Sequence, residues 1–110
     1  MGSVKRGDVV TVALQGDLGK PRPARVVQSD RFEPHPSVVL LPITSELRDL
    51  PLFRLRVEPS ITNGLSRASD IMIDTPQSVT RDKVRQVIGR ADDATLVGVN
   101  RLLAVFLGIA

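Results

Sequence analysis

Short segments rich in β-branched residues, separated by proline and glycine, are the feature that most limits what this chain can fold into. Residues 8–14 (DVVTVAL), 24–28 and 38–44 (VVLLPIT) each have the length and composition of a strand. Proline lacks the N–H group that a strand ladder uses, so Pro42 places the third segment at a sheet edge or at a bulge. The first two thirds of the chain therefore predict a compact β structure.

Residues 53–58 (FRLRVE) alternate apolar and charged side chains without a break. That period of two predicts a strand with one face on a core. The core face would carry Phe53, Leu55 and Val57, and the opposite, solvated face would carry Arg54, Arg56 and Glu58. Asn63 and Gly64 then suit a turn with positive φ, and residues 69–75 (SDIMIDT) predict one more strand that ends at Pro76.

The hydrophobic period changes after Asp92, where apolar residues recur at the spacing of one helix face. The buried stripe of that helix would consist of Val99, Leu102, Leu103 and Phe106. Asp92 or Asp93 suits the N-cap, and Gly108 suits the C-terminal end. The predicted fold class is therefore mainly β with a C-terminal helix: an open barrel or strongly bent sheet of five or more strands, with the helix packed on it.

Composition limits the classes of protein and of site that the chain can form. Its 110 residues, 42% of them hydrophobic, suffice for one core, so we expect a single domain over residues 1–110. No cysteine is present and His35 is the single histidine, which excludes thiolate sites and multi-histidine metal sites within one chain. No apolar run approaches the roughly 20 residues that cross a bilayer, so we expect a soluble, cytoplasmic protein. A net charge of +3 favours a polyanionic partner.

The segment KPRPARVVQSD, residues 20–30, holds an arginine between two prolines just before an apolar pair. Proline fixes φ, so Pro21 and Pro23 make a stiff, extended lead into a strand whose ladder would start near Ala24. Arg22 loses less backbone entropy there than it would on a flexible loop, which suits a site for an anionic ligand. The alternative is an exposed arginine that is simply solvated.

Several segments of the chain together resemble one known family. KRGDVV, PRPARVVQSD, VVLLPITS, IDTPQSVTRDKV and the closing FLGIA are similar, in order and spacing, to segments of the MazF/PemK toxin endoribonucleases of bacterial toxin–antitoxin pairs. The resemblance covers nearly the whole chain. It implies a small SH3-like barrel of the plasmid-maintenance-toxin type that works as a homodimer. It also implies cleavage of single-stranded RNA at a short sequence without metal or other cofactor, and neutralisation by a cognate antitoxin.

Carried over residue by residue, the resemblance implies two catalytic residues, Arg22 and Thr44. It also places on Asp74 an acid that some members use near the site. Certain members have a basic residue two positions before that acid, where this chain has Met72, so a second arginine is not implied there. The residues expected to contact RNA or antitoxin are Gly16, Asp17, Gly19, Lys20, Ser45, Arg54 and Arg56.

The chemistry of RNA cleavage fits these two residue types. When a 2′-OH attacks the neighbouring phosphorus without a metal, negative charge builds on the phosphoryl oxygens. A guanidinium offers that charge a planar fork of donors and stays protonated at any relevant pH. Thr44 would orient the 2′-OH or bind the phosphate, unless its hydroxyl bonds only its own backbone. The sequence offers no convincing general base. His35 has a suitable intrinsic pKa, but it stands between two prolines in a turn, and we expect it to be a solvated turn histidine.

Base recognition is constrained by the aromatic content. The chain has no Trp or Tyr, and of its three Phe residues Phe53 and Phe106 are expected to be buried, so stacking platforms are scarce. Recognition would then use arginine stacking, loop backbone and a groove shared by two subunits, which an acidic antitoxin segment could also fill.

Two other functions remain open. One is a toxin of the same fold that poisons gyrase, the CcdB type, but such toxins use a C-terminal Trp-Gly-Ile and this chain ends in FLGIA. The other is an inactive homologue that binds nucleic acid without cleaving it.

Overall fold

The computed structural model describes residues 4–13 and 20–110. Across those residues the chain forms seven strands, two short 3₁₀ turns and one α-helix. In chain order these are β1 (Asp8–Ala13), β2 (Pro21–Val26), the 3₁₀ turn Asp30–Phe32, β3 (Ser37–Thr44), β4 (Arg54–Val57), β5 (Ser69–Met72), β6 (Gln77–Thr80), the 3₁₀ turn Arg81–Lys83, β7 (Val84–Arg90) and α1 (Asp93–Leu107). The prediction of a mainly β fold with a C-terminal helix is confirmed.

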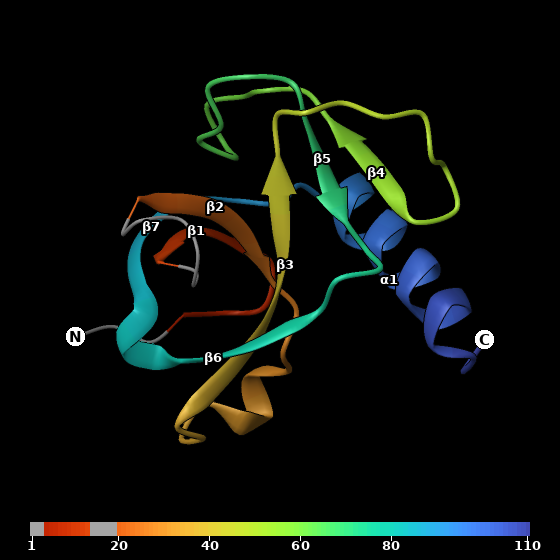
Figure 1. Ribbon diagram of the computed structural model, residues 1–110. Coiled ribbons are helices and arrows are strands. Elements are labelled where there is room, and N and C mark those ends of the chain that lie inside the picture. The colour runs from red at the N-terminus through yellow and green to blue at the C-terminus, as the bar shows by residue number, and fades with distance from the viewer. Residues whose placement is uncertain (1–3, 14–19) are drawn as a thin grey trace.

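The strands form an antiparallel sheet in the order β4-β5-β3-β2-β1-β7, and β6 also pairs with β3. Figure 1 shows that this sheet bends strongly and that α1 lies beside β4 and β5. β3 is the central strand: one edge pairs with β2, and the other pairs with β6 over residues 37–40 and with β5 at residues 43–44. Pro42 falls in the gap between β6 and β5. The proline therefore marks a change of partner within a central strand, and of the two expected positions, sheet edge or bulge, the sheet edge was wrong.

Two apolar clusters fill the two faces of the sheet, because neighbouring residues of a strand point to opposite sides. One cluster lies under α1 and contains Val9, Leu41, Ile43, Ile71, Ile73 and Val99. The other lies on the opposite face and contains Val10, Val12, Ala24, Val26, Val38 and Leu40. Phe53, Leu55 and Val57 pack against the first cluster, as the alternation in β4 predicts.

The helix begins and ends where the sequence predicts. The Asp92 carboxylate accepts the Thr95 N–H at 2.8 Å, and Gly108 closes the helix with φ +74°. Val99 is buried and the two leucines of the stripe are partly buried, but Phe106 is 48% exposed, so its predicted burial was wrong. Figure 1 gives the reason: the last turns of α1 extend beyond the sheet. Within the described ranges, no helix has the length and apolar character needed to cross a membrane.

Candidate active site

An open groove of about 650 Å³ lies where β2 and β3 approach the β4–β5 connection. It is lined by Arg22, Pro23, Pro42, Ile43, Thr44, Ser45, Glu46, Leu65, Ser66, Arg67, Ser69 and Met72. The two residues expected to be catalytic, Arg22 and Thr44, are therefore brought to one surface from distant parts of the sequence. Ser45, an expected contact residue, lines the same groove.

Strand register explains why Arg22 and Thr44 meet. β2 and β3 pair with Ala24 opposite Pro42. Continuing that antiparallel register by two residues sets Arg22 opposite Thr44, and opposite residues of neighbouring strands share a face of the sheet. Arg22 itself is held by β1, through the pairing of Val12 with Arg22. The ladder thus begins at Pro21 instead of Ala24, because in this part β2 has a strand on one edge only and proline is tolerated there.

Thr44 is the last residue of β3 and is half-buried. Its Oγ1 accepts the backbone N–H of Glu46 at 3.1 Å, which is the local bond that a threonine at a strand end commonly makes. That bond uses the oxygen as an acceptor, so the hydroxyl proton remains available for a substrate oxygen. The backbone bond and a role toward substrate are therefore compatible.

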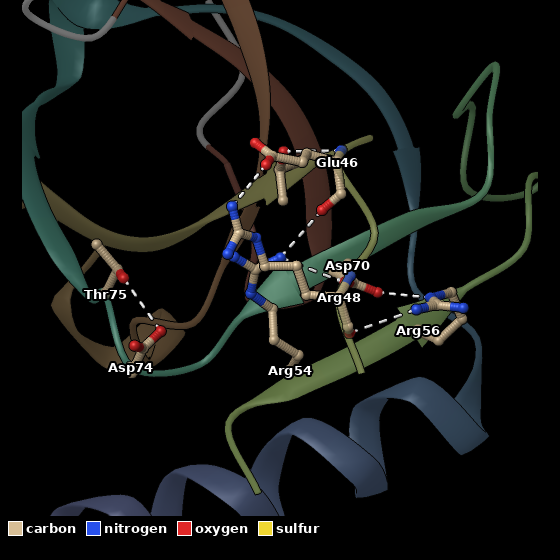
Figure 2. Close-up of polar contacts among 8 residues, drawn as sticks. Glu46, Arg48, Arg54, Arg56, Asp70, Asp74 and Thr75 are labelled. Atoms are coloured by element: carbon tan, nitrogen blue, oxygen red, sulfur yellow. Dashed lines mark hydrogen bonds and ion pairs between the residues drawn. The ribbon is translucent and has the colours of Figure 1, made fainter. Parts of the chain in front are cut away.

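A buried carboxylate fixes the loop that follows Thr44. Asp70 of β5, 1% exposed, lies opposite Thr44 of β3 and opposite Arg56 of β4. As Figure 2 shows, it joins the loop to two arginines. Its Oδ2 accepts the backbone N–H of Arg48 at 2.9 Å and Nη1 of Arg54 at 3.3 Å, and its Oδ1 accepts Nε of Arg56 at 2.6 Å. Burial pushes the pKa of Asp70 upward, but these donors outweigh it and hold the pKa below its ordinary value.

Arg54 and Arg56 were expected to form a solvated strand face, and for Arg54 that was wrong. The Arg54 side chain is only 11% exposed, and its Nη1 also donates to the Glu46 carbonyl at 3.1 Å. The Arg56 side chain is 46% exposed and its Nη2 donates to the Arg48 carbonyl at 3.4 Å. Both arginines thus brace the loop through Asp70, and they line a separate pocket of about 260 Å³ together with Arg48.

Comparison with known proteins matches residues 5–107 to the family described as PemK-like, MazF-like toxin of type II toxin–antitoxin system. The chain belongs to this family. It is 43% identical over 108 residues to a probable endoribonuclease MazF of Mycolicibacterium smegmatis (strain ATCC 700084 / mc(2)155). The aligned region covers 97% of this chain and 99% of that protein. The predicted family resemblance is confirmed.

Solved structures share the fold of this MazF-like toxin. A mycobacterial endoribonuclease in complex with its cognate antitoxin superposes with a TM-score of 0.83 at 23% identity, covering 98% of each chain. A MazE-MazF structure from Deinococcus radiodurans gives a TM-score of 0.80 at 21% identity, covering all of both chains. At these identities the likeness extends to the fold, including the bent sheet and the C-terminal helix.

Two residues of the groove were missed by sequence reasoning, Glu46 and Arg67. The Glu46 carboxylate accepts Nη2 of Arg48 at 2.7 Å, and that hydrogen bond and charge lower the pKa of Glu46. The exposed Arg67 adds a second cation to the groove beside Arg22. For Glu46 the sequence carried one usable signal, its position two residues after Thr44. For Arg67 it carried none.

Other predicted site residues of the MazF-like toxin lie away from the groove lining. Asp74 is exposed in the turn after β5, where it accepts the Thr75 hydroxyl at 3.2 Å (Figure 2), so its contacts are those of a turn residue. His35 is exposed and its Nδ1 accepts the Ser37 N–H at 3.1 Å, as expected of a turn histidine. Lys20 is exposed just before β2. The remaining predictions, Gly16, Asp17 and Gly19, lie outside the described residues.

Proposed function

We propose that this MazF-like toxin endoribonuclease cleaves single-stranded RNA in the groove at Arg22 and Thr44. The observation that carries the proposal is the placement of these two side chains on neighbouring strands of one groove. They are the residues at which the family resemblance expects catalysis. The 43% identical relative, named a probable endoribonuclease, supports the same activity.

The proposed reaction is an intramolecular transesterification. The 2′-OH attacks the adjacent phosphorus, the bond to the 5′ oxygen breaks, and the products carry a 2′,3′-cyclic phosphate and a 5′-OH. The Arg22 guanidinium donates hydrogen bonds to the phosphoryl oxygens as their charge grows. The Thr44 hydroxyl, oriented by the Glu46 N–H, donates to the same phosphate or to the attacking oxygen. In this scheme positioning and charge stabilisation need no metal ion.

Substrate binding in this proposal is mainly electrostatic. Arg22 and Arg67 place two cations on the groove, and cations suit a strand that carries a charge on every nucleotide. Ser45, which lines the groove, would contact the same strand and help to read its bases, giving cleavage at a short sequence. Arg56, which is partly exposed, is the better placed of the two β4 arginines to contact RNA or antitoxin.

A cognate antitoxin would silence the enzyme by covering this basic groove with an acidic segment. Two of the similar structures are described as complexes, one with a cognate antitoxin and one of MazE with MazF. We also propose a homodimer, because large apolar side chains stand exposed at the end of α1 and just after it: Val105, Phe106, Leu107 and Ile109. The toxin would act in the cytoplasm, where its RNA substrate is.

The test is incubation of purified protein with a long, mixed-sequence RNA in excess EDTA, followed by mapping of fragment ends. Wild type should give discrete cuts with cyclic or 3′ phosphate and 5′-OH ends. Arg22→Ala should give none, and Thr44→Ala should cut much more slowly. Arg85→Ala, at an exposed arginine of β7, is the matched control and should cut as wild type does.

Two results would contradict the proposal. Cutting by Arg22→Ala at the wild-type rate would overturn the site. No cutting by wild type shown to be folded would favour a binding toxin or an inactive nucleic-acid-binding homologue.

A further inference from the structure

The groove contains one side chain suited to accept a proton at neutral pH. Among the described residues that line it, Glu46 is the sole carboxylate and no histidine is present. A guanidinium offers donors and no acceptor, and serine and threonine hydroxyls are far too weakly basic. The cleavage proposed above needs an acceptor for the 2′-OH proton, and the residues named from sequence did not include one.

Three hydrogen bonds hold Glu46, two at its backbone and one at its carboxylate, and Figure 2 shows its partners Arg48 and Arg54. Its N–H donates to Thr44 Oγ1 at 3.1 Å, and its carbonyl accepts Nη1 of Arg54 at 3.1 Å. Its Oε1 accepts Nη2 of Arg48, whose own N–H is bound by the buried Asp70. The loop therefore fixes the backbone of Glu46 beside Thr44, and Arg48 holds the largely exposed side chain through Oε1, which leaves Oε2 to take a proton.

We propose that Glu46 is the general base of the RNA cleavage, an inference that rests on the proposed function. The Glu46 carboxylate takes the proton of the 2′-OH while the 2′ oxygen forms its bond to phosphorus. The bond from phosphorus to the 5′ oxygen breaks, and that oxygen takes a proton from solvent water. Protonated Glu46 then returns its proton to solvent, which restores the enzyme. Such proton transfer by a positioned carboxylate contributes about 10²–10⁴-fold to a rate.

The charged groups that face Glu46 determine the pH range of this step. Arg48 and Arg54 from the loop and β4, and Arg22 and Arg67 across the groove, are all cations. The hydrogen bond and charge of Arg48 hold the pKa of Glu46 below its ordinary value of 4.5, so the carboxylate is ionised throughout the neutral range. The phosphate of bound RNA opposes these cations and raises the pKa, which makes the carboxylate a better base when substrate is present.

The experiment measures kcat and KM in EDTA from pH 4 to pH 9 on a short RNA oligonucleotide that spans one mapped cut. Glu46→Gln should lower kcat by about 10²–10⁴-fold with KM within about twofold of wild type. Glu46→Asp, which keeps a carboxylate, should retain at least about tenfold more activity than Glu46→Gln. Circular dichroism checks that each variant is folded at every pH used.

A second variant separates a base from a purely structural carboxylate. Arg48→Met removes the main cause of the lowered pKa but keeps the backbone N–H that Asp70 binds. If Glu46 is the base, the acidic limb of kcat in Arg48→Met moves to higher pH, toward the ordinary carboxyl pKa. An equal loss at all pH values would overturn the assignment.

Two further outcomes are distinguishable. Wild type that cleaves, together with Glu46→Gln within about threefold of its kcat, would overturn the role of Glu46 alone. Folded wild type that does not cleave would overturn the proposed function, and the role of Glu46 with it.

Discussion

Replacing Arg25 with methionine should make the protein more stable. Arg25 lies within β2, opposite Val9 of β1 and Leu41 of β3, and is fully buried. Its Nε donates to the Val26 carbonyl at 3.3 Å, but Nη1 and Nη2 have no hydrogen-bond partner within the part of the chain that the structure describes. Burying a charged group without full compensation is costly, so the native residue is expected to be unfavourable for folding.

The magnitude follows from the pKa of Arg25. Burial, followed by the charges of Arg6 and Arg90, lowers the pKa to about 10. That depression corresponds to about 3 kcal/mol against the charged form in the folded state. The cost is fully present below pH 10, because a base with a lowered folded-state pKa destabilises the fold while it stays protonated. Methionine keeps the apolar stem and forfeits one weak hydrogen bond, worth about 1 kcal/mol, so the net gain is about 2 kcal/mol.

The gain is measurable by urea unfolding at pH 7, followed by circular dichroism because the chain has no Trp or Tyr. Both proteins are compared at the same concentration, with an expected rise in midpoint and an unchanged slope. Arg85→Met, at an exposed arginine, is the control and should change stability by less than about 0.5 kcal/mol. Arg25→Met as stable as wild type, or less stable, would refute the reasoning and mean that the buried guanidinium is compensated.

Three further predictions concern two substitutions, Asp70→Asn and Gly64→Ala. Asp70→Asn leaves Arg54 and Arg56 without their shared carboxylate and should cost about 3 kcal/mol in urea unfolding at pH 7; less than 1 kcal/mol would show that the network is not stabilising. Because the pKa of Asp70 is lowered in the folded state, the ionised carboxylate stabilises the fold above pH 3.8, and this stabilisation is lost as the pH falls through the folded-state pKa. The stability of Asp70→Asn should therefore depend less on pH in acid unfolding than that of wild type. Gly64→Ala should be destabilised by several kcal/mol in the same assay, because φ is +71° and a Cβ would lie 2.0 Å from the Ile88 carbonyl oxygen; near-native stability would mean that β7 shifts to make room.

Local patterns predicted the elements that depend on local physics. The period of two in residues 53–58 and the spacing of apolar residues after Asp92 each set one face on a core, and both were confirmed except at Phe106, which is exposed. β6 and β7 were not predicted, because their side chains are mostly exposed. The β1–β7 ladder also contains two register shifts, which break the alternation that sequence reading depends on.

The site residues whose positions the family resemblance supplied could be predicted from the sequence. Those whose environment depends on contacts between residues far apart in the sequence were harder to predict. Arg22 and Thr44 reach one groove through the β2–β3 register. The burial of the Arg54 side chain depends on its ion pair with Asp70, which lies 16 residues away on another strand. No local sequence pattern reveals that pairing. Glu46 lines the groove from a loop that the same carboxylate holds at the Arg48 N–H, which no local pattern predicts either.

The central claim is that Arg22 stabilises the transition state of RNA cleavage in this groove. Its most direct test is kcat/KM of wild type and Arg22→Ala on one short RNA that spans a mapped cut, in excess EDTA, with both proteins shown to be folded. The account predicts a loss of at least about 10²–10³-fold, the cost of removing a donor to a developing oxyanion. Activity of Arg22→Ala within about twofold of wild type would contradict it.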